Sequence, residues 1–268
     1  MALENCSLCR GTGWKLVPRT DGTRGSVAVA CDCGMEERAA RVISRAHIPK
    51  RYEHCDFESY VTDLADGKNY APHQTAALKR AKMITETFVR EYPGSDQAGL
   101  LLMGNSGVGK THLAVAALKE LLKHGHTGYF CEYGAILREI QNSYRSESEI
   151  SEIRLLDPVL SVEVLVIDDL GCIKPSDWVR DTIAYILNTR YIEASKDLSH
   201  PRCTIITTNF LDEEKEVSSS GTKTIRKDRL EERIGDRMRS RLYEMCRTVE
   251  VFAPDFRREV RQAGRARA

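Results

Sequence analysis

The chain has 268 residues, which is enough for one α/β domain and a small additional module. Its 40 basic and 39 acidic residues give a formal net charge of +1, so net charge alone does not indicate a nucleic-acid partner. No segment approaches the roughly 20 apolar residues of a membrane span, and the first residues do not resemble a signal peptide. We therefore expect a cytoplasmic protein without a membrane partner.

Four of the nine cysteines are clustered near the N-terminus, with Cys6 and Cys9 in one pair and Cys31 and Cys33 in a second. The other five are scattered, as is usual for thiols in a reducing compartment. Two close pairs separated by a loop predict a tetrahedral four-sulfur metal site. Zinc is the expected metal, and an iron–sulfur cluster is the alternative.

Residues 1–47 are expected to form this N-terminal zinc-binding module and a helix. Residues 27–30 are compatible with a short strand that leads into the second cysteine pair, and residues 35–46 have a helical composition that ends before Pro49. A module of this size has a small core, so the bound metal would supply much of its stability. His47 or His54 could replace one of the cysteines as a ligand.

Residues 48–97 are interpreted as a linker and the N-terminal part of a larger domain. They contain a polar stretch at 62–69 and an amphipathic helix at 75–92, which ends at Pro93 and Gly94. The core of the larger domain is expected at 98–258. Residues 259–268 are expected to be a solvated basic tail.

A phosphate-binding loop of the form G-x-x-x-x-G-K-T follows an apolar segment at 98–103 and opens an apolar helical pattern at 111–122. Successive backbone N–H groups of such a loop surround phosphate oxygens. The lysine reaches the β- and γ-phosphates, and the threonine hydroxyl holds Mg²⁺. The residues of the loop are Gly104, Asn105, Ser106, Gly107, Val108, Gly109, Lys110 and Thr111. The loop predicts that the chain binds ATP with Mg²⁺.

Strands and helices are expected to alternate after this loop. Further strands are predicted at 129–133, 162–167, 204–208 and 248–252, and helices at 136–144, 150–156 and 178–195. This alternation predicts an α/β fold with a parallel, doubly wound sheet. A flexible surface loop is expected at 218–222.

Polar residues follow two of the predicted strands directly. Asp168 and Asp169 end one apolar strand, and Asn209 follows another. Ligands of parallel sheets lie beyond the carboxyl ends of the strands, so these side chains are expected near the phosphate loop. Asp168 would bind Mg²⁺ together with Thr111, while Asp169 would point the other way along the strand and orient or deprotonate a water molecule. Asn209 could contact the γ-phosphate or that water.

Several short motifs between residues 48 and 258 together resemble those of the AAA+ ATPases. The resemblance is to the branch that contains DnaC- and DnaI-type helicase loaders and IstB-type transposition ATPases. Besides the phosphate loop, the motifs are Ile48-Pro49 with Arg51-Tyr52, Asp56-Phe57-Glu58, Ile167-Asp168-Asp169-Leu170-Gly171, Thr207-Thr208-Asn209, Ser240-Arg241-Leu242 and Asp255-Phe256-Arg257. The five predicted strands would form the parallel sheet of such a P-loop core.

The resemblance also implies roles for individual residues. Lys110 and Thr111 match the Walker A positions, Asp168 and Asp169 the Walker B pair, and Asn209 matches sensor 1. These roles imply ATP hydrolysis that is slow and dependent on an oligomer or on DNA.

Other implied roles concern residues outside these strand ends. Arg241 is the best match to the arginine finger, which a neighbouring subunit supplies, and Arg237 is the second choice. Arg257 corresponds weakly to sensor 2, and the region of Phe57 would lie near the adenine.

The chain departs from the wider family in two respects. Many AAA+ proteins have Asp-Glu where this chain has Asp168 and Asp169, and the chain ends about a dozen residues after Arg257, without a full helical lid. Nucleotide closure would then depend on a neighbouring subunit. The branch also implies contacts with single-stranded DNA by the helical region after the second strand, where Arg138, Tyr144 and Arg145 are candidates.

The expected function is the ATP-dependent loading or remodelling of a replicative DNA helicase on single-stranded DNA. The N-terminal cysteine module at residues 6–33 would bind the helicase. The alternative is an IstB-like helper protein for DNA transposition, whose partner is a transposase. A further alternative is a nucleotide-gated adaptor with negligible hydrolysis. A homo-oligomer assembled with ATP is expected.

Overall fold

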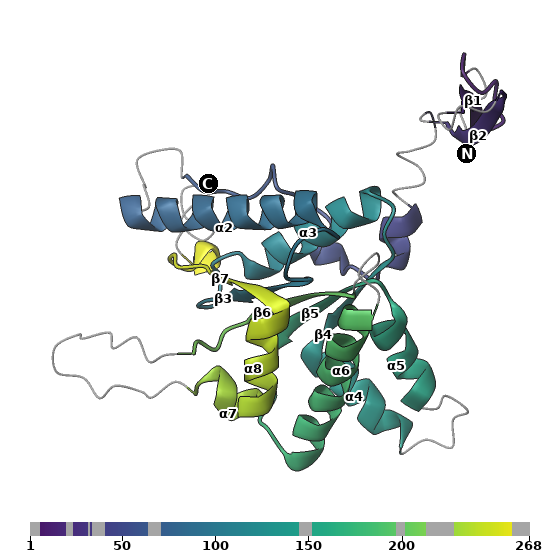
Figure 1. Ribbon diagram of the computed structural model, residues 1–268. Helices are drawn as coiled ribbons and strands as arrows, with labels where there is room; N and C mark the ends of the chain where they lie inside the picture. The colour runs from purple at the N-terminus through teal and green to yellow at the C-terminus, as the bar shows by residue number, and fades with distance from the viewer. Residues whose placement is uncertain are drawn as a thin grey trace. The chain divides into compact units, whose positions relative to one another are not determined.

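The computed structural model describes residues 6–19, 24–31, 33, 41–63, 71–144, 152–196, 202–212 and 228–258. The chain divides into two compact units, Met1–Ala46 and His47–Ala268 (Figure 1). Arg145, the loop at 218–222 and the tail at 259–268 lie outside the described residues. Within the described ranges, no helix is both long enough and apolar enough to cross a membrane.

The first unit contains an antiparallel hairpin of β1 (Trp14–Pro18) and β2 (Ser26–Ala30), in which Trp14 pairs with Ala30 and Pro18 with Ser26. The second strand matches the sequence-based expectation, and the first was not predicted. The hairpin brings the two cysteine pairs together, because Cys31 donates its backbone N–H to the carbonyl of Gly13 at 2.8 Å. Residues 41–45 are helical, within the helix expected at 35–46.

The second unit contains the predicted five-stranded parallel sheet, with the order β4-β5-β6-β3-β7. The strands are β3 (Gly99–Met103), β4 (Gly128–Glu132), β5 (Val164–Leu170), β6 (Cys203–Thr208) and β7 (Cys246–Glu250). All residues of β3 and β6 are buried, as expected for strands covered on both faces. The α/β fold class is therefore confirmed.

Helices cover both faces of this sheet (Figure 1). On one face lie α2 (Pro72–Glu91) and α3 (Lys110–Lys123). On the other lie α4 (Tyr133–Ser143), α5 (Glu152–Ser161), α6 (Asp177–Lys196), α7 (Leu230–Ile234) and α8 (Asp236–Met245). The sequence placed Tyr133 in a strand, but it is the first residue of α4. Alternate residues of β3, Leu101 and Met103, pack into the core beneath α4 to α8.

The order of the strands positions the candidate site. Because β6 lies between β3 and β5, its carboxyl end separates the phosphate loop after β3 from the acidic end of β5. The carboxyl ends of parallel strands share one edge of a sheet, so the residues at all three ends face the same region.

A buried arginine stabilises the other end of the strands, where β5 and β6 begin. The Arg190 guanidinium on α6 is fully buried and donates hydrogen bonds to neutral oxygens of α5, of β6 and of the two residues just before β5. The acceptors are the Thr204 hydroxyl at 2.8 Å and the carbonyls of Val159, Leu160, Val162, Glu163 and Cys203 at 2.6 to 3.5 Å. One side chain thus connects the end of α5 with the beginnings of β5 and β6.

Replacing this guanidinium should destabilise the domain. Arg190→Met leaves several buried carbonyls without a donor, and each such loss costs free energy. We expect the free energy of unfolding to fall by about 3 kcal/mol, measured by urea denaturation. Arg180→Met, which removes an exposed arginine from the same helix, is the matched control. Equal effects of the two substitutions would contradict this role of Arg190.

Candidate nucleotide-binding site

The phosphate loop requires glycine at both ends. Gly104 has φ +152°, and an added Cβ would lie 2.2 Å from the carbonyl oxygen of Val251. Gly109 has φ +94°, and an added Cβ would lie 2.6 Å from the ring of Tyr60. A side chain at either position would be strained and would clash. Glycine at these two positions therefore allows the loop to adopt this conformation at the N-terminus of α3, where backbone N–H groups favour an anion.

Lys110 lies beneath the loop with its ammonium group surrounded by oxygens. Its Nζ donates hydrogen bonds to the carbonyls of Gly104 at 2.9 Å and Asn105 at 2.8 Å, and to Oδ1 of Asn209 at 2.8 Å. These are all the hydrogens that an ammonium can donate. Burial lowers the pKa of Lys110 to about 8, because it disfavours the charged form.

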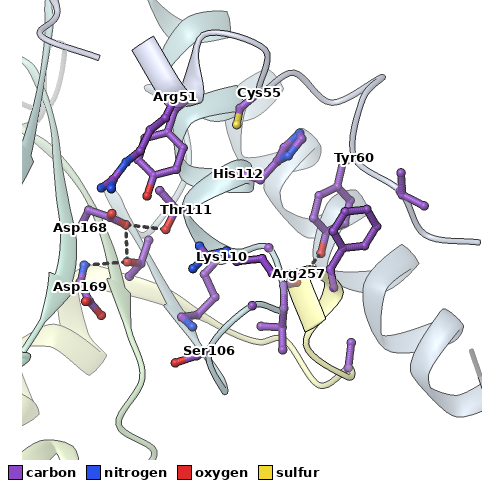
Figure 2. Close-up of a pocket in the computed structure, with 18 of the residues that line it drawn as sticks. Arg51, Cys55, Tyr60, Ser106, Lys110, Thr111, His112, Asp168, Asp169 and Arg257 are labelled. Carbon is purple, nitrogen blue, oxygen red and sulfur yellow. Dashed lines mark hydrogen bonds between the residues drawn. The ribbon is translucent and has the colours of Figure 1, made fainter. Parts of the chain in front are cut away.

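Asp168 is the buried carboxylate of the site. Its Oδ1 accepts hydrogen bonds from the hydroxyl of Thr111 at 2.8 Å and from that of Thr207 at 2.7 Å (Figure 2). Only 3% of the residue is exposed, and this burial raises the pKa of Asp168. The oxygens of Asp168 and Thr111 are thus adjacent, and Mg²⁺ binds through carboxylate and hydroxyl oxygens of this kind.

The sequence predicted that Asp169 points away from Asp168, but both residues line the same cleft. The cause is a bulge in β5: Ile167 pairs with Ile206 and Leu170 with Thr208, so two residues of β5 face one of β6. Asp169 adopts φ +62° there. Strict alternation of side chains therefore does not apply at this strand end.

Asn209 connects the lysine of the phosphate loop with a carboxylate of β5. Its Oδ1 accepts the hydrogen bond from Lys110, and its Nδ2 donates to Oδ1 of Asp169 at 2.6 Å. The backbone N–H of Asp169 donates to the Thr207 hydroxyl at 2.9 Å. The end of β6 thus connects the phosphate loop with both carboxylates of β5.

These residues line a cleft with a volume of about 710 Å³ (Figure 2). The loop, both carboxylates and Asn209 form one wall. Another is formed by residues between 51 and 61, which we call the strap, and Arg257 also lines the cleft. The region of Phe57 was expected near the adenine. Phe57 itself is buried and is not one of the described residues that line the cleft, but Cys55 and Ser59 on either side of it in the strap are.

Two side chains of α3 hold the strap in place. Lys119 donates to Oδ1 of Asp56 at 2.6 Å and to the carbonyl of Glu53 at 3.0 Å. Nε2 of His112 donates to the carbonyl of Asp56 at 2.8 Å. These roles were not predicted from the sequence, although His112 directly follows Thr111 and must therefore lie near the phosphate loop.

The predicted arginine finger lies outside the cleft. Arg241 on α8 donates to Oδ1 of Asn188, and its guanidinium lies 5.3 Å from the ring centroid of Tyr191. Arg237, the second choice, is exposed on the same helix. Neither is one of the described residues that line the cleft of its own chain.

The four N-terminal cysteines converge in the first unit. Their sulfur atoms all lie within 4.8 Å of one another, with Cys6 and Cys31 at 3.7 Å and Cys9 and Cys33 at 3.4 Å. Hydrogen bonds from backbone N–H groups lower the pKa of the Cys6 thiol to about 6. His47 and His54, considered as substitute ligands, belong to the other unit.

A family model described as IstB-like ATP binding protein matches residues 44–261, which include the complete cleft. The chain belongs to this family. The match confirms the resemblance drawn from the motifs, since it covers the phosphate loop, the strand ends and the strap. Membership of this family makes the chain an ATP-binding protein.

Other members of this branch are similar to the chain. The replicative helicase loaders DnaC of Buchnera aphidicola subsp. Schizaphis graminum and of Escherichia coli K12 are each 30% identical over 150 residues. These alignments cover 56% of this chain, and the chain spans only 56% of those relatives.

Solved structures are similar over a larger part of the IstB-like chain. A DnaC helicase loader matches with TM-score 0.57 and 30% identity, over 76% of this chain and 100% of that one. The DnaI structure matches with TM-score 0.52 and 25% identity, over 78% of this chain and 94% of that one. DnaA bound to AMPPCP and single-stranded DNA, at 18% identity and TM-score 0.51, shows only the fold.

The lowered pKa of Lys110 should make ATP binding weaken at alkaline pH. A bound triphosphate favours the charged ammonium, so the pKa of Lys110 is higher with ATP than without it. Below pH 8 the lysine is charged in both states. Above pH 8 only the ATP-free state loses the proton. We expect ATP affinity to be constant from pH 7 to 8 and to fall by up to about tenfold for each further unit.

Fluorescent-nucleotide titration across this range measures the effect. Lys110→Arg is the control, because a guanidinium stays charged throughout. The variant should bind ATP with an affinity that does not depend on pH, whatever its absolute value. The same decline in both proteins would exclude Lys110 as the titrating group.

Proposed function

We propose that this chain uses ATP to load or remodel a replicative DNA helicase on single-stranded DNA during the initiation of replication. The observation that carries the proposal is the similarity to the DnaC helicase loader, whose solved chain is covered over its whole length at 30% identity. Two further DnaC sequences and the DnaI structure support it.

The residues of the cleft have the chemistry for ATP hydrolysis. Oxygens of Asp168 and Thr111, 2.8 Å apart, would hold Mg²⁺, which neutralises charge on the phosphates when bound. Lys110 would exchange some of its three oxygen acceptors for phosphate oxygens. Asp169, held by Asn209, would orient the attacking water and accept its proton.

A second copy of the chain would complete this site. Phosphoryl transfer gains much from an arginine near the developing charge, and a neighbouring subunit often supplies it. Since Arg241 lies outside the cleft of its own chain, we assign it as the finger for the cleft of a neighbour in an ATP-dependent homo-oligomer. Hydrolysis by the isolated subunit would then be slow.

Arg241→Ala should therefore bind ATP with unchanged affinity and lose hydrolysis by about a thousandfold, measured as phosphate release at a concentration that supports assembly. Asn188→Ala is the matched control, because it removes the contact of Arg241 on α6 and keeps the guanidinium. It should hydrolyse ATP. If Arg241→Ala hydrolyses ATP and Arg237→Ala does not, Arg237 is the finger instead.

The cysteine module is proposed to hold one zinc ion and to contact the helicase. A tetrahedral zinc with Zn–S bonds of 2.3 Å separates its sulfurs by about 3.8 Å. The distances of 3.4 and 3.7 Å within the cluster fit that value. The cysteines of an iron–sulfur cluster bind several irons and lie further apart, so this geometry favours a single ion.

A transposition helper remains the second candidate, because the matching family model is the IstB-like one. Its partner would be a transposase. The cysteine module lies almost entirely before residue 44, where this family match begins, so the family match does not account for it. A nucleotide-gated adaptor would differ from both in lacking hydrolysis.

Size-exclusion chromatography of the purified chain with the replicative helicase of its host, with and without ATP, tests the proposal. We expect the chain and the helicase to elute as a complex, and ATP to increase the amount of that complex. ATP should not have this effect on Lys110→Ala, because nucleotide binding is abolished in that variant. Binding to a transposase and not to the helicase would overturn the loader function. ATP turnover with and without single-stranded DNA then separates a loader from a non-hydrolysing adaptor.

A further inference from the structure

A second group of metal-ligating side chains lies at the edge of the nucleotide cleft, apart from the four N-terminal cysteines. His54, Cys55 and His112 each offer one ligand atom, and these three atoms lie within 4.8 Å of one another. His54 and Cys55 belong to the strap, and His112 belongs to α3. All three line the cleft, where Figure 2 labels Cys55 and His112.

The three side chains of this group lie close to one another. Nε2 of His54 lies 4.0 Å from Sγ of Cys55. The rings of His54 and His112 meet edge to face, with centroids 6.1 Å apart. Cys55 is 2% exposed, so it is fixed by packing, while His54 is exposed and can move towards the other two.

The surroundings of His112 also resemble those of a ligand. Histidines that bind metals usually donate their second ring N–H to a carbonyl or carboxylate, which fixes the tautomer. Nε2 of His112 makes such a bond to the Asp56 carbonyl, and the Ser59 hydroxyl lies 3.2 Å from the same nitrogen. Nδ1 then carries the lone pair.

We propose that His54, Cys55 and His112 bind a Zn²⁺ ion that fastens the strap to α3 beside the nucleotide cleft. Two imidazoles and one thiolate are a ligand set for zinc, and a site with three protein ligands leaves the fourth position for water. The ligands of a tetrahedral zinc lie about 3.5 Å apart. The three atoms here lie within 4.8 Å of one another, so they must draw closer together, and the exposed His54 can move to allow this. Magnesium prefers the oxygens of Thr111 and Asp168, so the two ions select different sites.

The ion would link two segments that are more than fifty residues apart in the sequence. The strap forms a wall of the cleft and is already held to α3 by Lys119 and His112. Zinc would strengthen this attachment and reduce the freedom of the wall. The proposal does not rest on helicase loading, and its test requires no nucleotide.

Zinc titration of the full-length, metal-stripped protein against a chromophoric chelator tests the site. Wild-type protein should bind two equivalents, one at the four cysteines and one at this site, and His54→Ala should bind one fewer than wild type. His54 is exposed, so its loss does not threaten folding. His124→Ala, which removes an exposed histidine next to the end of α3, is the matched control and should titrate like wild type.

Cobalt binding gives a second readout, because a thiolate ligand produces a characteristic charge-transfer absorption. In a background in which Cys6, Cys9, Cys31 and Cys33 are all replaced by serine, so that the N-terminal cluster offers no thiolate, the cobalt complex should retain a thiolate band that Cys55→Ser abolishes. If His54→Ala binds as many zinc equivalents as wild type, the proposal is overturned. Loss of one equivalent in His124→Ala as well would also overturn it, since any histidine would then have the same effect.

Discussion

The bridge that Asn209 makes between Lys110 and Asp169 is the interaction on which the rest of the site depends. It joins the phosphate loop to the acidic end of β5 through the end of β6. The Thr207 hydroxyl adds a parallel connection, since it donates to Asp168 and accepts from the backbone of Asp169. Lys110, Asp168 and Asp169 are therefore held in fixed positions relative to one another, and preorganised groups of this kind stabilise charge that develops in a transition state.

This network is possible because of the strand order. β6 lies between β3 and β5, so its last residues lie next to the ends of both neighbouring strands. At the other edge of the sheet, Arg190 ties β5 and β6 to the end of α5. The pair of strands that carries the acidic residues is thus held at both ends, by a polar network at one and by a buried cation at the other.

Much of this architecture follows from local sequence patterns. Apolar runs such as that of β3, followed by a glycine-rich loop and a helical pattern, predicted the parallel sheet and the place of Lys110 and Thr111. The strand β1 was missed because Trp14 and Leu16 are exposed in a short segment without a buried face of its own. Its pairing depends on a partner strand that follows a further eight residues along the chain.

The errors at the site have a different cause. The bulge that turns Asp169 into the cleft depends on the register between β5 and β6, which no local pattern encodes. The packing of Tyr60 and His112 against each other joins segments about fifty residues apart. Side-chain alternation and helical periodicity describe one element at a time, so neither can reveal contacts that arise only when distant elements pack.

The hydrogen bonds of Lys110 have a consequence for how the protein senses its ligand. All three protons of the ammonium are already engaged by oxygens of the protein, so a triphosphate must displace some of these acceptors rather than fill an empty coordination shell. When the amide of Asn209 loses its donor, the carboxylate that it holds on β5 loses a fixed neighbour. Exchange of the Asn209 acceptor would thereby carry the arrival of the nucleotide across the central strand through a change of hydrogen-bond partners.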